Sequence, residues 1–150
     1  MIQRLFFILV MLFSSLTVFA QTSLQINKLF DGRYRKLPNA VEIVVTGESA
    51  NKLKLNMFRS LSVSEDKGVE QEIERLVVKD GAKALDKEAE YREGNLYYGF
   101  YRFKSEKKAM NRYVFYLNQA YASKNPVNKV TVIYMESREN ADYIRSLIKK

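Results

Sequence analysis

The sequence has no histidine, cysteine or tryptophan, and only two prolines and six glycines among its 150 residues. Without histidine, it cannot form a Ser-His-Asp triad or a two-histidine zinc helix. Without cysteine, thiol nucleophiles, disulfides and structural zinc sites are excluded. Neither the G-x-G-x-x-G nor the G-x-x-x-x-G-K-[ST] motif occurs, which excludes the common dinucleotide and P-loop sites. Carboxylates, lysine, tyrosine, serine and threonine remain for chemistry.

The first 20 residues have the pattern of a secretory signal peptide. Arg4 supplies a short positive region, Leu5–Phe13 is continuously apolar, and Val18-Phe19-Ala20 forms a small-residue cleavage site. The apolar run is shorter than the roughly 20 residues that a membrane-spanning helix needs, so no transmembrane span is expected after cleavage. We therefore expect a signal peptide at 1–20 and one exported domain at 21–150, periplasmic or extracellular.

The charge of the chain is strongly basic, with 25 Lys and Arg residues against 17 Asp and Glu residues. Only one basic residue lies in the predicted signal peptide, so the excess belongs to the exported domain. Outside the cytoplasm, the available polyanions are acidic or phosphorylated envelope glycans and anionic lipid head groups. Nucleic acid is therefore an unlikely partner, although a basic chain in the cytosol would suggest it.

Hydrophobic periodicity predicts helices near residues 23–34, 49–57, 66–79 and 138–148, the last capped by Ser137. Alternating β-branched and aromatic residues predict strands at 40–46, 59–64, 96–103, 112–118 and 129–136. Residues 82–92 fit either a helix, from their Ala, Lys and Glu content, or a strand. The order α-β-α-β-α-β-β-β-α predicts an α+β fold: a single two-layer domain with a mainly antiparallel sheet of about five strands, packed by helices.

Residues 96–103 and 112–117 form an unusually aromatic predicted hairpin. A turn centred in 104–111 places Phe100 opposite Phe115 and Gly99 opposite Tyr116. The same register pairs Tyr98 with Leu117, and Tyr101 with Val114. Strand side chains alternate, so one face carries Tyr98, Phe100, Phe115 and Leu117. We name the other the tyrosine face: Tyr97, Tyr101, Val114 and Tyr116. The Tyr116 ring is expected to cover the bare backbone at Gly99.

Taken together, the export signal, the strand AVEIVVT (40–46), the segment LSVSED (61–66) entering a helix, the aromatic hairpin and the capped terminal helix resemble small exported families of Gram-negative envelope bacteria that are classed only as domains of unknown function. The likeness covers nearly all of the exported domain in element order. It implies export and an α+β fold, and it brings no catalytic residues to this chain.

The tyrosine face is the predicted binding site. Tyrosine combines a large contact area with a polar tip, so an exposed Tyr97, Tyr101 and Tyr116 would suit a glycan, peptide or second subunit. Four residues would give the site a basic rim, named here the basic hairpin end: Lys104, Lys107, Lys108 and Arg112. The alternative is that another part of the chain covers this face, because aromatic residues are ordinary strand formers.

Three functions fit these observations. The first is a non-enzymatic exported protein that binds an envelope protein or glycan through the tyrosine face. The second is a small carboxylate-dependent envelope hydrolase, for which the acid pairs Glu65/Asp66 and Glu88/Glu90 are available in the sequence. The third is a homodimer through the tyrosine face. Asp66, Glu70 and Glu72 could attract a cation, but their spacing is not that of an EF-hand, so no cofactor or metal is expected.

Overall fold

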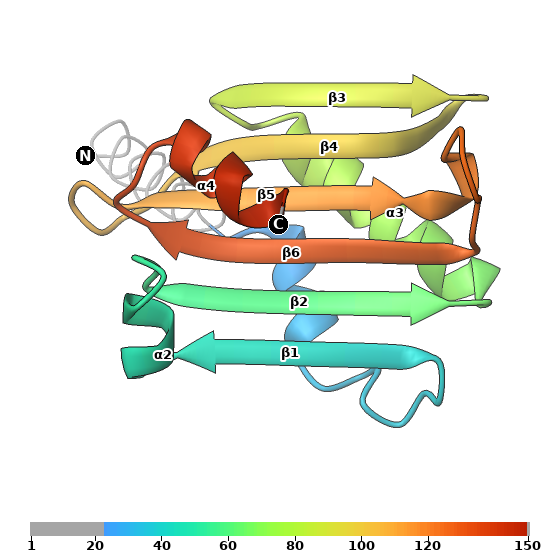
Figure 1. The fold of residues 1–150 in the computed structure, drawn as a ribbon, viewed down its shortest axis with the longest axis horizontal. Coiled ribbons are helices and arrows are strands. Elements are labelled where there is room, and N and C mark those ends of the chain that lie inside the picture. The colour runs from blue at the N-terminus through green and yellow to red at the C-terminus, as the bar shows by residue number, and fades with distance from the viewer. Residues whose placement is uncertain (1–22, 150) are drawn as a thin grey trace, which may run out of the picture.

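A computed structural model describes residues 23–149 of the chain, and the predicted signal peptide lies outside them. These residues form one six-stranded sheet in the order β1-β2-β6-β5-β4-β3, with every neighbouring pair antiparallel (Figure 1). The strands are β1 (Ala40–Thr46), β2 (Met57–Ser64), β3 (Asp86–Arg92), β4 (Asn95–Lys104), β5 (Asn111–Asn118) and β6 (Lys129–Ser137). The α+β class is confirmed. Segment 82–92, which fitted either a helix or a strand, contains the sixth strand, β3.

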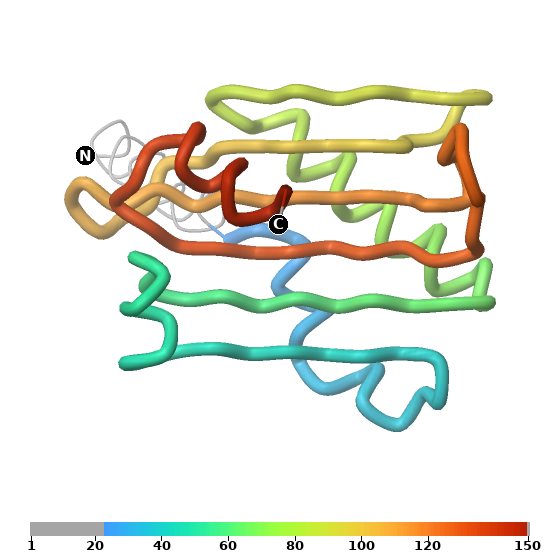
Figure 2. The backbone as a smooth tube through the Cα atoms, in the orientation of Figure 1, coloured from blue at the N-terminus to red at the C-terminus, as the bar shows by residue number. Residues whose placement is uncertain are grey.

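Helices lie on both faces of the sheet. They are η1 (Gln25–Phe30), α2 (Gly47–Asn51), α3 (Lys67–Gly81), η2 (Gln119–Tyr121) and α4 (Ala141–Ile148), where η denotes a 3-10 helix. The tube in Figure 2 shows α4 in front of the sheet, with α3 and η1 behind it. Each face has its own apolar core, one around Tyr116 and Ile73 and the other around Phe115 and Ile144. The prediction of two layers is therefore wrong, because the terminal helix covers the face opposite α3.

Helix α3 matches its sequence signals closely. Its first turn is capped by Asp66, whose Oδ1 accepts a hydrogen bond from the Val69 N–H at 3.1 Å. Its apolar stripe of Ile73, Leu76 and Val77 is buried against the sheet. This agreement follows because capping and periodicity are local properties of the chain.

The first predicted helix, at 23–34, is reduced to the short 3-10 helix η1. The buried carboxylate of Asp80, near the end of α3, accepts the N–H groups of Gln25 and Ile26 at 2.8 and 2.9 Å. Gly32 has φ +96°, a left-handed conformation that a continuing helix does not contain. The helix predicted at 49–57 is likewise shorter, because Met57 already belongs to β2.

The cap of the last helix is Asn140, not Ser137. The Oδ1 atom of Asn140 accepts the Tyr143 N–H at 3.0 Å. Ser137 is the last residue of β6, and its hydroxyl donates to the Lys54 carbonyl at 2.7 Å. The strand thus continues one residue further than the pattern indicated, and the helix begins later.

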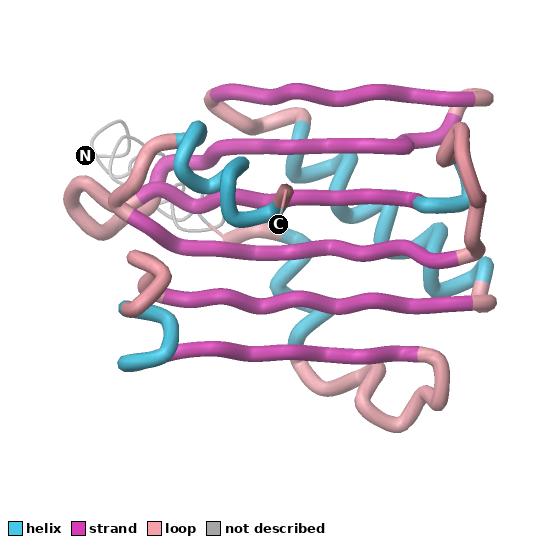
Figure 3. Tube along the Cα trace, in the orientation of Figure 1, coloured by secondary structure: helices cyan, strands magenta, loops and turns pink. Residues whose placement is uncertain are grey.

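The two edge strands in Figure 3, β1 and β3, differ in protection. In β3, five of the seven residues in DKEAEYR are charged, which discourages pairing with another strand. In β1 the only charged residue is Glu42, while Val41, Ile43 and Val44 are 59%, 48% and 51% exposed. The β1 edge is therefore the aggregation-prone edge of this sheet.

We expect Ile43→Lys to reduce aggregation when the protein is heated, because a lysine on an edge strand opposes pairing with a second strand. Static light scattering during a thermal ramp measures this effect. The matched control is Ala89→Lys, which adds the same charge to exposed β3. Equally reduced aggregation in both variants would assign the effect to net charge. Unchanged aggregation in both variants would exclude the β1 edge as the cause of aggregation.

Candidate functional site

The register of the aromatic hairpin is as predicted. Phe100 pairs with Phe115, Gly99 with Tyr116, Tyr101 with Val114, and Tyr98 with Leu117. The expected exposure of the tyrosine face, however, is wrong for two of its three tyrosines. Tyr101 and Tyr116 are 2% and 0% exposed, in the core beneath α3 and η1. Neither ring is available to a partner, or to a second copy of the chain, at the surface of this fold.

Tyr97 departs from the tyrosine face because of a bulge. Between β3 and β4 the register shifts, so that Tyr91 lies opposite Leu96 and Glu90 opposite Tyr98, which leaves Tyr97 without a partner. Leu96 therefore enters the core that contains Tyr101, and Tyr97 is half-buried. The Arg92 guanidinium carbon lies 3.7 Å from the centre of the Tyr97 ring, as in a cation–π contact.

The bare backbone at Gly99 is covered by Tyr101, not by Tyr116 as expected. A Cβ atom built at Gly99 would lie 2.6 Å from Cε2 of Tyr101. On the other side of the ring, a Cβ atom at Gly81 would lie 2.5 Å from Cε1. The ring thus fits between the end of α3 and the backbone of β4, and both glycines permit this close approach.

The buried tyrosines keep their phenol protons near neutral pH. Burial, with a minor contribution from Tyr91, raises the pKa of Tyr101 to about 12. Burial also raises the pKa of Tyr116 and Tyr134 well above the ordinary range of a phenol. These side chains are therefore neutral near pH 7, and their rings pack in the core.

The basic hairpin end is brought together as one surface. Lys104, at the end of β4, and Lys107 and Lys108, in the β4–β5 connection, are exposed at the end of the sheet where β6 ends and β2 begins (Figure 2). Arg112, in β5, is half-buried and donates from Nη2 to the Lys104 carbonyl at 2.8 Å, a contact that joins the two strands at the base of the hairpin. Sequence reasoning found this cluster because its members lie within the short segment 104–112.

A cavity of about 470 Å³ opens beside this hairpin. Its charged lining consists of Arg102, Lys104, Lys107 and Lys108 against Glu106. Leu85, 56% exposed, adds an apolar wall. A second cavity of about 450 Å³ shares Leu85 and Lys104 and extends to Lys83 and Arg112. The arrangement can bind a negatively charged group beside an apolar surface.

Another cavity, of about 210 Å³, lies at the opposite end of the sheet beside α3. We name it the α3 cavity; its lining includes Lys67, Glu70, Glu74, Asn118, Tyr121 and Asn128. Sequence reasoning did not find it. The spacing of Glu70 and Glu74, four residues apart on one helix, was the available signal, because such residues share a helix face.

The acids named for the hydrolase hypothesis have other partners. Asp66 caps α3, and Glu65 accepts from the Asn128 side chain at 3.3 Å. Glu88 is paired with Arg145 at 3.1 Å, and Glu90 with Arg92 at 2.8 Å, on the exposed strand β3. In these positions the acids support caps and surface ion pairs.

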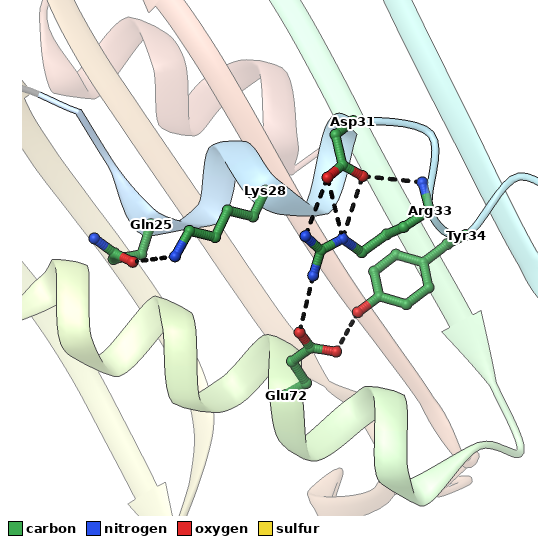
Figure 4. Close-up of polar contacts among 6 residues, drawn as sticks. All are labelled: Gln25, Lys28, Asp31, Arg33, Tyr34 and Glu72. Atoms are coloured by element: carbon green, nitrogen blue, oxygen red, sulfur yellow. Dashed lines mark hydrogen bonds and ion pairs between the residues drawn. The ribbon is translucent and has the colours of Figure 1, made fainter.

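Glu72, one of the acids considered for cation binding, connects α3 to the segment after η1 (Figure 4). It accepts a short hydrogen bond from the Tyr34 hydroxyl and forms an ion pair with Arg33 at 3.3 Å. Burial and the neighbouring Glu72 carboxylate raise the pKa of Tyr34 to about 12. Glu72 therefore does not join Glu70 in a common site. Within residues 23–149, no three or more Asp or Glu side chains are placed so that they could hold a metal ion.

Comparison with known proteins identifies a family. A family model described as "Family of unknown function (DUF6108)" matches residues 13–148, which include nearly all of the described fold. No curated protein and no solved structure gives a significant match. Within residues 23–149, none of the helices has the length and apolar character needed to cross a membrane. The resemblance to a family of unknown function is confirmed.

Proposed function

The chain belongs to this family of unknown function, and we propose that it is an exported, non-enzymatic binding protein that holds an acidic envelope glycan at its basic hairpin end. The carrying observation is the cavity beside the hairpin, whose lining contains four cationic residues and one acidic residue. This site replaces the tyrosine face, because Tyr101 and Tyr116 are buried.

The charges in this cavity are unequally compensated. Arg102 is paired with Asp86 at 2.5 Å, and Lys107 Nζ lies 3.8 Å from Glu136. Lys104 and Lys108 make no ion pair within residues 23–149. Their ammonium groups are compact point charges, which suit carboxylate or phosphate groups presented by a flexible polymer.

The shape of the cavity also favours a glycan. Sugar rings present apolar C–H faces as well as charged groups, and Leu85 offers an exposed apolar wall beside the lysines. The predicted signal peptide supports export, which would place the protein where acidic and phosphorylated glycans occur.

We expect Lys104→Glu/Lys108→Glu to weaken binding to immobilised heparin, an acidic glycan probe, by about tenfold or more, equivalent to about 1.4 kcal/mol. Two attractive charges become repulsive next to the cavity, and such interactions weaken as salt screens them. Surface plasmon resonance at several salt concentrations measures the change, with neutral dextran as the reference surface.

The matched control is Lys36→Glu/Lys124→Glu, which makes the same change of net charge at the opposite end of the sheet. Retained heparin binding by this control would locate the site at the hairpin. If both double variants lose affinity equally, heparin responds to net charge alone and the proposed site is incorrect. If the unaltered protein binds heparin no better than dextran, the proposed function itself fails.

A further inference from the structure

The α3 cavity lies at the end of the sheet away from the basic hairpin end and differs from it in charge. It is enclosed by the first half of α3, the start of β4 and the connection between β5 and β6. At the roughly 30 Å³ that one water occupies in the liquid, its volume of about 210 Å³ corresponds to about seven waters. This is enough space for one small polar molecule.

One buried oxygen atom that lines the cavity has no hydrogen-bond partner, Oε1 of Glu70. A second unpaired oxygen, the hydroxyl of the fully buried Tyr116, belongs to a residue outside the cavity lining. The pKa of Tyr116 is raised mainly by burial and also by Glu74, Glu70 and Tyr121, which all line the cavity. Asn118 is also nearby, but it forms no hydrogen bond of ordinary geometry with this hydroxyl. Unpaired polar atoms are costly inside a protein, so a donor group that reaches either oxygen would be favoured.

The cavity attracts positive charge. It contains two carboxylates, Glu70 and Glu74, against one lysine, Lys67. Burial, followed by the nearby Glu65 and Asp66 carboxylates, raises the pKa of Glu70. Glu74 is held in place by a short hydrogen bond from the Leu96 N–H, so one wall of the cavity is fixed. A ligand with a positive charge would offset the repulsion between the Glu70 and Glu74 carboxylates.

We propose that the α3 cavity binds a primary ammonium group carried by a small polar molecule, at a site separate from the basic hairpin end. An ammonium has three N–H donors, which suit the carboxylate oxygens of Glu70 and Glu74 in the lining, with the unpaired Tyr116 hydroxyl as an acceptor behind it. Only two side chains of the metal-ligating types, Glu70 and Glu74, line this cavity, and nowhere within residues 23–149 are three or more of them placed to hold a metal ion. The amide side chain of Asn118 can bond hydroxyl groups elsewhere on the ligand.

The experiment titrates the protein with glucosamine and, separately, with glucose, while amide NMR signals are followed. The two sugars share a ring, and only glucosamine carries an ammonium group. We expect glucosamine to shift the signals of residues 70–74 and 118–121 and to bind at least about tenfold more tightly than glucose, because a charge-assisted hydrogen bond is lost without the ammonium.

Two variants locate the binding. Glu70→Gln should weaken glucosamine binding by about tenfold, because the uncharged amide keeps the shape but not the charge. Tyr116→Phe removes one oxygen, and it should weaken glucosamine binding several-fold without lowering stability, because that hydroxyl is unpaired in the free protein. Glu48→Gln, an exposed change of the same charge in α2, is the control and should bind glucosamine like the unaltered protein.

Equal affinity for glucose and glucosamine would overturn the ammonium assignment. An absence of shifts at 70–74 and 118–121, or unchanged binding by both Glu70→Gln and Tyr116→Phe, would overturn the site. Because heparin binding is measured at the other end of the sheet, failure of this proposal would leave the proposed function standing, and the reverse also holds.

Discussion

Replacing Gly99 with alanine is expected to lower the free energy of unfolding by about 1–3 kcal/mol, the usual cost of overpacking a core. The added Cβ would lie 2.6 Å from Cε2 and 2.8 Å from the hydroxyl oxygen of Tyr101. The ring also packs closely against Gly81 on its other side, where even a Cβ atom would lie only 2.5 Å from Cε1, so it has little room to move away from β4. Urea unfolding followed by circular dichroism measures the loss, and Gly81→Ala should show a similar one.

The control for both substitutions is Gly68→Ala. At Gly68, in the first turn of α3, the nearest atom to an added Cβ is Asp66 Oδ1 at an ordinary 3.6 Å. This variant should gain about 0.4–1 kcal/mol, because alanine restricts the unfolded chain. Tyr101→Leu removes the ring, so Gly99→Ala should cost less in that background. A Gly99→Ala cost that is the same with and without the Tyr101 ring would contradict the proposed packing.

The second large effect is expected at Asp80. Asp80→Ala should destabilise the protein by about 3 kcal/mol, because two buried N–H groups each lose an acceptor at a cost of about 1–3 kcal/mol. Those groups belong to Gln25 and Ile26, which begin the segment that covers the core with Leu29. Chemical unfolding measures the global loss, and faster proteolysis within 25–37 would locate it. Asp142→Ala, at a 92% exposed side chain in a surface ion pair, should change stability by less than about 1 kcal/mol.

Asp80 also predicts a pH dependence. Burial raises the pKa of its carboxyl, although the hydrogen bonds from the Gln25 and Ile26 backbone partly oppose this. The folded protein therefore binds the Asp80 proton more tightly than the unfolded chain. The corresponding stabilisation is present at acidic pH and is lost as the pH rises through the raised folded pKa. Asp80→Asn should remove this contribution from unfolding free energies measured between about pH 3 and pH 7. An unchanged pH profile in Asp80→Asn would show that the carboxyl has similar proton affinities in both states.

The strand register could be predicted because it depends on local information. Once the hairpin turn is centred in 104–111, pairing Phe100 with Phe115 also determines the pairing of Gly99 with Tyr116. The burial of Tyr101 and Tyr116 could not be predicted in the same way. Apolar residues on both faces of a strand indicate that something covers each face, but not which segment does so. The face with Tyr101 and Tyr116 is covered by α3 and η1, whose packing depends on distant parts of the chain.

The two candidate sites differ in predictability for the same reason. Lys104, Lys107 and Lys108 follow one another in a single turn, so their grouping is visible in the sequence. The α3 cavity combines Glu70 and Glu74 with Asn118 and Tyr121, which meet only when η2 and β5 are placed beside the helix. Its unpaired oxygens are a property of that assembly.

Composition and local pattern were enough to predict the residue types available for chemistry, the α+β class, the hairpin register and the cap of α3. Each of these depends on composition or on neighbours a few residues apart. Long-range packing was needed to show that helices cover both faces, that Tyr101 lies between Gly81 and Gly99, and that a bulge turns Leu96 inward in place of Tyr97. Side chains alternate with a period of two along a strand. One inserted residue therefore reverses which side chain faces the core, and burial is determined by segments distant in the sequence that pack against that face.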